Sequence, residues 1–128
     1  MGSEFSFYNY VDGAGNDVIR AWLETLPTKP RQRFKTWLLH LEGTPHGNWT
    51  RPYVETLDGY CAGLFEIRVS LGKQYRLLGT HMGKTPTLLH GFIKPGKKVR
   101  REECDRAFKH LADVSSDPEK HRVEHSYD

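Results

Sequence analysis

Hydrophobic positions in the first third of the chain change their spacing, and each change marks an expected element. Residues 5–11 alternate aromatic with polar side chains, which predicts a β-strand. Helical spacing follows, with Asn16 as a candidate N-cap and apolar positions at Val18, Ile19, Trp22, Leu23 and Leu26. Pro27 and Pro30 end this helix and begin a second one. The second helix closes at Gly43 and carries Phe34, Trp37, Leu38 and Leu41 on one face, so the pattern predicts an αα-hairpin.

The middle of the chain changes from helical spacing to alternation. Residues 43–60 are rich in Gly, Pro, Asn and Thr and predict a long loop. One side of the next segment is apolar, at Phe65, Ile67, Val69 and Leu71, and the other is polar, at Glu66, Arg68 and Ser70. A tight turn at Gly72 and Lys73 leads to a partner strand at residues 74–80. Residues 87–94 are apolar enough to predict a third, central strand.

From Arg101 onward the apolar positions again have helical spacing, at Cys104, Ala107, Phe108 and Leu111. This spacing predicts a last helix at residues 101–112. The resulting order, β-α-α-β-β-β-α, predicts an α+β fold with a four-stranded, mostly antiparallel sheet. We expect the helices on one face of the sheet and an open, solvated opposite face that can bind a partner. The side chains expected in the core are Trp22, Leu23, Phe34, Trp37, Phe65, Ile67, Val69, Phe92 and Phe108.

The ends of the chain differ in character from the middle. Residues 1–4 resemble an expression scar, and the N-terminus has neither the basic nor the apolar region of a signal peptide. We therefore expect one domain at residues 5–112 in the cytoplasm, and no apolar run is long enough for a membrane span. Residues 113–128 hold few apolar side chains and predict a polar, mobile tail.

Two cysteines, Cys61 and Cys104, lie far apart and form no CxxC pair. In a reducing cytoplasm we expect both to be thiols, and two cysteines alone cannot build a zinc site. Cys104 falls at an apolar position of the last predicted helix, which favours buried packing.

The net charge of +3 is unevenly distributed. Residues 113–128 contain five acidic side chains against Lys120 and Arg122, a balance of −3, so the remainder carries +6. A basic domain with an acidic end favours a polyanionic partner, although simple solubility explains the charge almost as well.

Basic side chains gather on the strand face that the apolar residues leave free. By alternation, Arg68 and Arg76 point away from the core. Further cations lie in the hairpin turn, at the end of the third strand and just after it: Lys73, Lys94, Lys97, Lys98, Arg100 and Arg101. Such a cluster suits phosphate binding, whereas the simpler interpretation is a solvated sheet face.

Other chemistries lack a motif. No phosphate-binding loop or dinucleotide fingerprint follows a strand, and no serine-nucleophile motif is present. His121 and His125 have i,i+4 spacing but no obvious third ligand, so we expect neither a metal nor another cofactor.

Three stretches resemble the RelE superfamily, and within it the phage-derived, HigB-like branch. They are Gly63-Leu64-Phe65-Glu66-Ile67-Arg68-Val69, then Gln74-Tyr75-Arg76-Leu77-Leu78, then Leu88-Leu89-His90-Gly91-Phe92-Ile93-Lys94. The resemblance covers residues 5–112, and the predicted element order agrees with it independently. It implies the toxin of a type II toxin–antitoxin system. Such a toxin is an endoribonuclease that cleaves messenger RNA, usually on the ribosome, and it has a small cognate antitoxin, which we expect to be of the helix-turn-helix type.

The resemblance also implies roles for individual residues. Arg76 matches the strand arginine that holds the scissile phosphate, and Arg68 lies where a Lys or Arg helps to set up the attacking group. Lys98 lies where many members place a second phosphate-binding cation, and Lys73, Lys94, Lys97, Arg100 and Arg101 would bind flanking RNA. The last helix has Cys104 where some members have Tyr or His, so the general acid stays unassigned.

Such a site needs no metal, because the ribose 2′-oxygen attacks phosphorus while cations stabilise the developing charge. A cluster of positive side chains lowers the pKa of a neighbouring Lys, which lets that Lys act as a base. Glu66, on the same face as Arg68, is an alternative base, and a salt bridge to Arg68 or Arg76 is an equally good interpretation of Glu66. His90 could donate a proton, but a histidine in a central strand is more often structural. The alternative function is a non-catalytic module, or a decayed toxin, that binds RNA or the ribosome with the same basic face.

Overall fold

The computed structural model describes residues 5–49, 54–96 and 101–127. Along the chain its elements are β1 (Tyr8–Tyr10), α1 (Val18–Glu24), α2 (Thr28–Glu42), the 3₁₀-helix η1 (His46–Asn48), β2 (Val54–Thr56), the 3₁₀-helix η2 (Gly59–Cys61), β3 (Phe65–Leu71), β4 (Lys73–Thr80), β5 (Thr87–Ile93), α3 (Arg101–Ser116), α4 (Pro118–His121) and β6 (Arg122–Glu124). None of the helices in these ranges is long and apolar enough to cross a membrane.

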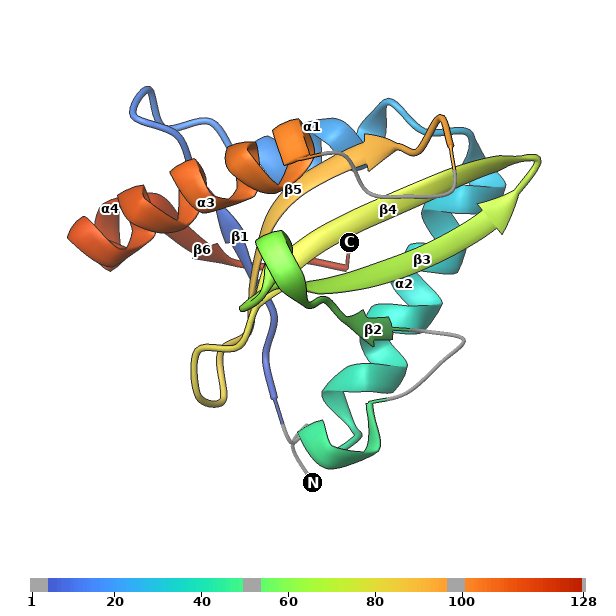
Figure 1. Ribbon diagram of the computed structural model, residues 1–128, viewed down its shortest axis with the longest axis horizontal. Coiled ribbons are helices and arrows are strands. Elements are labelled where there is room, and N and C mark those ends of the chain that lie inside the picture. Colours follow the sequence, from blue (N-terminus) through green and yellow to red (C-terminus); the bar gives the residue numbers. More distant parts are fainter. Residues whose placement is uncertain (1–4, 50–53, 97–100, 128) are drawn as a thin grey trace.

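The strands form one mixed, six-stranded sheet in the order β2-β3-β4-β5-β1-β6 (Figure 1). The predicted antiparallel meander of β3, β4 and β5 is present at its centre. The expectation of four strands is wrong: β2 lies in the segment expected to be a loop, and β6 lies in the expected tail. Both extra strands are only three residues long, so alternation within them is too short to predict a strand. The strand β1 pairs parallel to β5 and antiparallel to β6.

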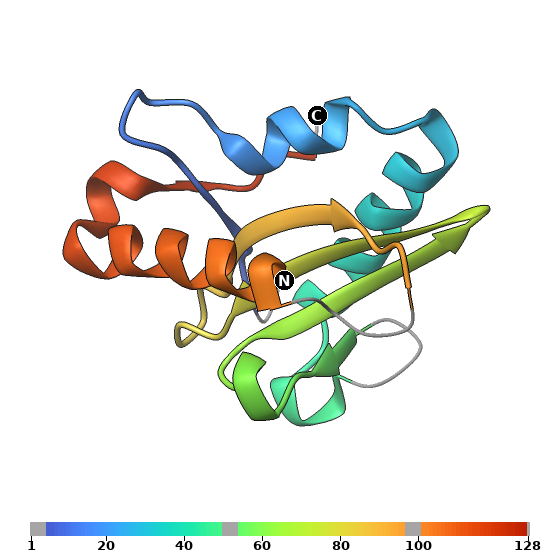
Figure 2. The same cartoon turned by 45° about the horizontal axis from the view of Figure 1, so that its top comes forward.

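Helices cover both faces of the sheet, which corrects the expectation that they lie on one face. The helices α1 and α2 pack on the face that carries Phe65, Ile67 and Leu77, and α3 packs on the opposite face (Figures 1 and 2). The apolar side chains buried with α3 include Leu64, Leu78, Leu89 and Phe92. The β5 strand therefore needs apolar residues on both sides, in agreement with its nearly continuous apolar sequence.

Local sequence signals explain where the helices begin and end. The N-cap of α1 is Asp17, one residue after the predicted Asn16, and its carboxylate accepts a hydrogen bond of 2.9 Å from the Arg20 amide. Gly43 closes α2 as expected. The last helix continues beyond residue 112 to Ser116, because Val114 adds a fully buried side chain to the same face.

Most of the predicted core is buried. The side chains of Leu23, Phe34, Phe65, Ile67, Val69 and Phe92 are buried. Trp22, Trp37 and Phe108 are only partly buried against the same clusters. The Trp37 indole reaches across the sheet face and donates a 2.8 Å hydrogen bond to the Arg68 carbonyl, which explains its position at the edge of the core.

The C-terminal residues 113–127 form the end of α3, then α4 and β6, in place of the expected polar tail. Tyr10 donates a 2.6 Å hydrogen bond to Asp113, which ties β1 to the end of α3. His121 donates to the Val11 carbonyl at 2.8 Å, and His125 donates to the Asn9 side-chain oxygen at 3.0 Å. These polar contacts, the pairing of β6 with β1 and the buried side chain of Val114 together attach the segment to the domain.

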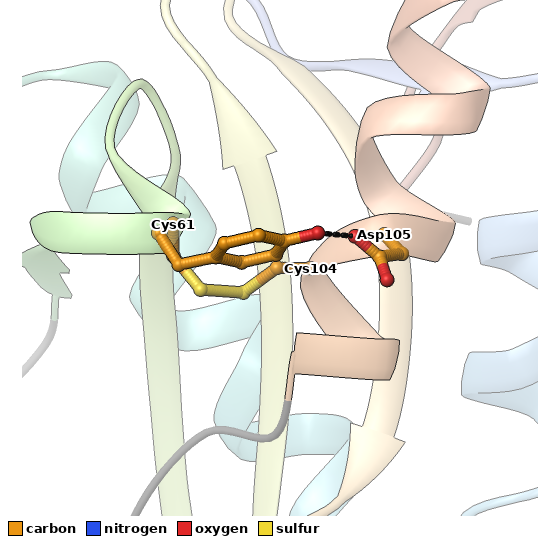
Figure 3. Close-up of a disulfide and its surroundings, with 4 residues drawn as sticks. Cys61, Cys104 and Asp105 are labelled. Atoms are coloured by element: carbon orange, nitrogen blue, oxygen red, sulfur yellow. Dashed lines mark hydrogen bonds between the residues drawn. A yellow bond between two sulfur atoms is a disulfide. The ribbon is translucent and has the colours of Figure 1, made fainter.

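Cys61 and Cys104 form a disulfide, with a Cα–Cα distance of 5.7 Å, so the expectation of two free thiols is wrong (Figure 3). The bond joins η2 to the first turn of α3 across 43 residues of sequence. Cys104 is fully buried, as predicted, but beside its partner cysteine. Sequence spacing gives no indication of this proximity, because it arises only when α3 folds back over the sheet.

A tight contact on the α1 face yields a first prediction, for the variant Gly91→Ala. A β-carbon at residue 91 would overlap ring atoms of Trp22, whereas one at Gly13 meets nothing within 4 Å. We expect Gly91→Ala to lower the free energy of unfolding by about 1–3 kcal/mol through overpacking. Urea unfolding measures the change, with Gly13→Ala as the matched control. Equal stabilities of the two variants would contradict the packing of α1 on β5.

A second prediction concerns the pH dependence of stability. Burial lowers the pKa of His125 to about 4, against the raising effect of Asp17 and with a smaller lowering by Arg20. In the unfolded chain this histidine titrates at about 6.5, so between these two values the unfolded state binds more protons. The free energy of unfolding should therefore fall as the pH is lowered from 6.5 to 4.

The matched variant for this pH effect is His125→Gln, which keeps a polar side chain but does not titrate. Its free energy of unfolding should fall less steeply than that of the native protein over the same pH window. Urea titrations at pH 7, 5.5 and 4.5 make the comparison. Parallel curves for the two proteins would show that His125 titrates normally in the folded state.

Candidate functional site

The candidate site lies on the α3 face of β3, β4 and β5, where three cross-strand rows of side chains lie side by side. The first row contains Glu66, Leu78 and His90, and the second contains Arg68, Arg76 and Phe92. The third contains Ser70 and Gln74, followed by Lys94, whose amide bonds to the Gln74 carbonyl at 2.8 Å. Since alternate residues of a strand share a face, this register follows from the alternation seen in the sequence.

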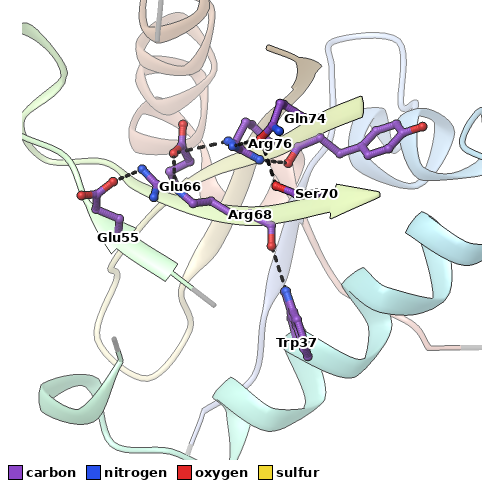
Figure 4. A network of polar contacts seen from close by, with 8 residues as sticks. Trp37, Glu55, Glu66, Arg68, Ser70, Gln74 and Arg76 are labelled. Atoms are coloured by element: carbon purple, nitrogen blue, oxygen red, sulfur yellow. Dashed lines mark hydrogen bonds and ion pairs between the residues drawn. The ribbon is translucent and has the colours of Figure 1, made fainter. Parts of the chain in front are cut away.

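Five polar side chains form a connected set that we name the arginine–glutamate network: Glu55, Glu66, Arg68, Gln74 and Arg76 (Figure 4). Oε1 of Glu66 accepts a 2.7 Å hydrogen bond from Nε of Arg68 and lies 3.6 Å from Nε of Arg76. The other side of Arg68 pairs with Glu55, which comes from the edge strand β2. The salt-bridge interpretation of Glu66 is thus confirmed by the geometry.

Arg76 is more enclosed than the sequence suggests. Its side chain is 7% exposed, Nη1 donates to the Tyr75 carbonyl at 2.8 Å, and Nη2 donates to Oε1 of Gln74 at 2.5 Å. Ser70 donates to the same Gln74 oxygen at 2.9 Å. Burial lowers the pKa of the Arg76 guanidinium below its ordinary value, and the nearby Glu66 carboxylate opposes that change. These contacts fix the orientation of the guanidinium.

The predicted face is therefore correct but it is not open. Phe65 and Ile67 lie in the core against α2, as the register argument requires, yet Glu66 on the opposite side is also fully buried. The first turn of α3 lies over this row, since Cys104 packs in one cluster with Leu78. Arg68, with 28% of its side chain exposed, forms the more accessible edge of the network.

Two buried polar atoms of the network have no hydrogen-bond partner among the described residues: Oε2 of Glu66 and Nε of Arg76. Folded proteins satisfy the large majority of such atoms, because an unpaired buried polar group costs about 1–3 kcal/mol. An acceptor and a donor inside a charged cluster, without a protein partner in the described part of the chain, are available to an ordered water or to a polar group of a ligand.

The remaining predicted cations lie around the network with different exposure. Lys73 is exposed at the β3–β4 turn, and Lys94 is partly buried beside Gln74. Arg101 is exposed at the start of α3, with its guanidinium 4.8 Å from the ring centre of Tyr60. Lys97, Lys98 and Arg100 lie outside the described residues.

His90, at the end of the first row, contacts α3. Its Nε2 lies 2.7 Å from Oε2 of Glu103, whose other oxygen accepts a hydrogen bond from Arg106. Burial lowers the pKa of His90, against the raising effect of Glu103. This contact supports the structural interpretation of His90, because the imidazole nitrogen already pairs with a carboxylate of α3.

Three side chains at the candidate site were not identified from the sequence: Glu55, Gln74 and Glu103. Gln74 was recognisable, because it alternates with Arg76 in the same strand. Glu55 lies in a segment that is loop-like by composition, and Glu103 lies in the first turn of the last helix, where an acidic side chain is explained by the helix dipole alone. Only the strand pairing of β2 and the path of α3 bring these two carboxylates to the site.

The fold and the site together define a class: a small protein with a mixed sheet between helices, in which a buried carboxylate separates two strand arginines. A family model described as "Phage derived protein Gp49-like (DUF891)" matches residues 21–112. The chain therefore belongs to the phage-derived Gp49-like family. The matched segment runs from α1 into α3 and includes every residue of the arginine–glutamate network. Among curated proteins, no match to this chain was found.

Proposed function

We propose that this protein is the toxin of a type II toxin–antitoxin system and acts as a metal-independent endoribonuclease on messenger RNA in the cytoplasm, in association with the ribosome. Membership of the Gp49-like family supports a toxin-like role. The resemblance of β3, β4 and β5 to the HigB-like branch of the RelE superfamily supports the RNA substrate. The observation that carries the proposal is the pair of opposed arginines, Arg68 and Arg76, around a buried glutamate with one unpaired oxygen.

In the proposed reaction the ribose 2′-oxygen attacks the adjacent phosphorus, and the bond to the 5′-oxygen of the next nucleotide breaks. The products are a 2′,3′-cyclic phosphate and a 5′-hydroxyl end, because the leaving 5′-oxygen takes up a proton from solvent, to which the base later returns the proton of the 2′-hydroxyl. Arg76 and Arg68 donate hydrogen bonds to the phosphoryl oxygens, where negative charge increases in the transition state. The Glu66 carboxylate, through Oε2, accepts the proton of the 2′-hydroxyl.

Cations around the network would bind the flanking phosphates. Lys73, Lys94 and Arg101 lie at the accessible margins, and Lys97, Lys98 and Arg100 belong to the same basic group by sequence. Each phosphate contact of this kind adds affinity that falls with salt concentration. The cognate antitoxin, which we propose to be a helix-turn-helix protein, would neutralise the toxin by covering or distorting this basic face.

One observation favours the alternative of a non-catalytic RNA- or ribosome-binding module. Two arginines in the network are balanced by two glutamates, Glu55 and Glu66, and Arg76 is nearly buried. In this closed arrangement the exposed cations could bind RNA while the network remains structural. Cleavage requires the network to become accessible, so the two functions differ in whether substrate reaches Arg76.

A third prediction uses the variant Arg76→Lys to distinguish the ribonuclease from the non-catalytic binding module. Lysine keeps the positive charge beside Glu66 but cannot donate two parallel hydrogen bonds to a phosphoryl group. Cleavage of messenger RNA should fall by roughly 100- to 1,000-fold, as for the loss of one transition-state donor. Arg76→Ala is a less suitable change, because it removes a counter-ion from a buried carboxylate.

The control for this experiment is Lys35→Ala, which removes an exposed cation from α2 on the opposite side of the sheet. Growth arrest after induction and mapping of messenger RNA ends provide the readouts, with circular dichroism to verify folding. A folded Arg76→Lys protein that cuts messenger RNA at the native rate would eliminate the catalytic assignment and favour the binding module.

A fourth prediction concerns metals. The protein, stripped with EDTA and gel-filtered before it is added to ribosomes and message, should cleave as fast as the untreated protein, because the proposed charges come from side chains. Chelator is removed beforehand, since ribosomes themselves need Mg²⁺. Loss of cleavage on stripping, with recovery on addition of zinc, would overturn the mechanism and direct attention to His121 and His125.

A further inference from the structure

The disulfide lies at the edge of the candidate site. It joins Cys61, at the end of η2 and partly accessible, to the fully buried Cys104 in the first turn of α3 (Figure 3). Two further contacts connect the same elements: the Tyr60 hydroxyl donates to Asp105, and the Arg101 guanidinium lies over the Tyr60 ring. The disulfide is the only covalent link among these contacts, and the other two are exposed to solvent.

The first turn of α3 covers one row of the network face. Cys104 packs with Leu64 and Leu78, and Glu103 contacts His90. Leu78 is paired directly with Glu66 in the neighbouring strand. The first turn of α3, which the disulfide holds, therefore lies over the row of Glu66, Leu78 and His90. Oε2 of Glu66, which has no partner among the described residues, belongs to this row.

We infer that the Cys61–Cys104 disulfide is a reversible modification site, a redox latch that keeps the first turn of α3 closed over the arginine–glutamate network. Oxidation by a disulfide compound, which takes up two electrons and two protons from the cysteine thiols and becomes two thiols, stores the protein in the closed form, and reduction by a thiol makes the network accessible. The effect on RNA cleavage rests on the proposed function, whereas the release of the α3 turn does not.

The reduction step is ordinary thiol–disulfide exchange. A thiolate of a small dithiol or of a dithiol protein attacks the sulfur of the partly accessible Cys61, and Cys104 leaves as a thiolate and takes up a proton. The second thiol of the reductant then displaces Cys61. The reductant becomes a disulfide, the two cysteines become thiols, and two electrons have passed to the protein.

Opening should be local, because the rest of α3 has its own anchors. Ala107 and Val114 are fully buried, His110 bonds to the Leu89 carbonyl at 2.6 Å, and Asp113 accepts the hydrogen bond from Tyr10. The first turn of a helix lacks intrahelical partners for its amides, so it is the part that frays first once a tether is removed. Reduction therefore releases the cover without unfolding the domain.

The test compares the oxidised protein with the same protein reduced by dithiothreitol, with two readouts. Amide hydrogen exchange should speed up at least tenfold at residues 59–64 and 101–106, and stay unchanged at residues 108–114. Cleavage of ribosome-bound messenger RNA should rise at least tenfold on reduction. The variant Cys61→Ala/Cys104→Ala should cleave as fast as the dithiothreitol-treated native protein, whether or not dithiothreitol is present.

A matched control is Tyr60→Phe, which removes the hydrogen bond to Asp105 and retains the disulfide, and which should still respond to dithiothreitol. If the double variant fails to fold, Cys61→Ser, which changes only the partly accessible cysteine, takes its place. Equal hydrogen exchange in the oxidised and reduced states overturns the latch. If reduction speeds hydrogen exchange but the oxidised and reduced proteins cleave RNA at the same measurable rate, the disulfide does not control access to the network.

A third outcome distinguishes the latch from the proposed function. If reduction speeds exchange but no state cleaves RNA, the ribonuclease assignment fails, and binding of a short single-stranded RNA then decides about the latch. Affinity that rises at least tenfold on reduction supports control of access to the network. Unchanged affinity overturns it.

Discussion

The buried carboxylate of Glu66 permits two arginines to lie opposite each other on neighbouring strands. Arg68 and Arg76 form a direct cross-strand pair, where like charges repel. Oε1 of Glu66 lies 2.7 Å from one guanidinium and 3.6 Å from the other, and Gln74 accepts a further hydrogen bond from Arg76. A slip of one residue in this register would turn all of these charges into the apolar layer against α2, at a prohibitive cost. The pairing of β3 with β4 and the polar network therefore require each other.

Coverage of this face by α3 changes what the network can do. On an open sheet the arginines would be solvated and free to contact a phosphate, whereas here partners from β2, β3 and β4 orient them, and two polar atoms have no partner among the described residues. Incomplete hydrogen bonding in a low-dielectric interior is costly, so the closed form is less stable than a fully satisfied network. The closed face and the unpaired atoms fit a site that is prepared for a ligand and not yet accessible to it.

Closure depends on segments that are remote in the sequence. The disulfide attaches η2 to α3, and the C-terminal segment pairs with β1 through β6, so both sides of the central meander are fixed by late parts of the chain. His121 and His125 add hydrogen bonds to residues of the first strand region. The histidines that spacing alone related to metal binding are thus structural contacts between the two ends of the domain.

The sequence alone determined the two consecutive N-terminal helices, the β3–β4–β5 meander and the side of β3 that carries Glu66 and Arg68. These follow from hydrophobic spacing and turn residues, which act over a few positions along the chain. It did not determine the strands β2 and β6, the burial of Arg76, the Glu55 and Glu103 contacts or the disulfide. Each of these depends on segments that meet only after folding. Three-residue strands have too little alternation to recognise, and a polar segment can be fixed by hydrogen bonds that leave no apolar pattern. Tertiary packing of α3 on the second face of the sheet thereby converted a predicted open, basic surface into a closed and charge-balanced site.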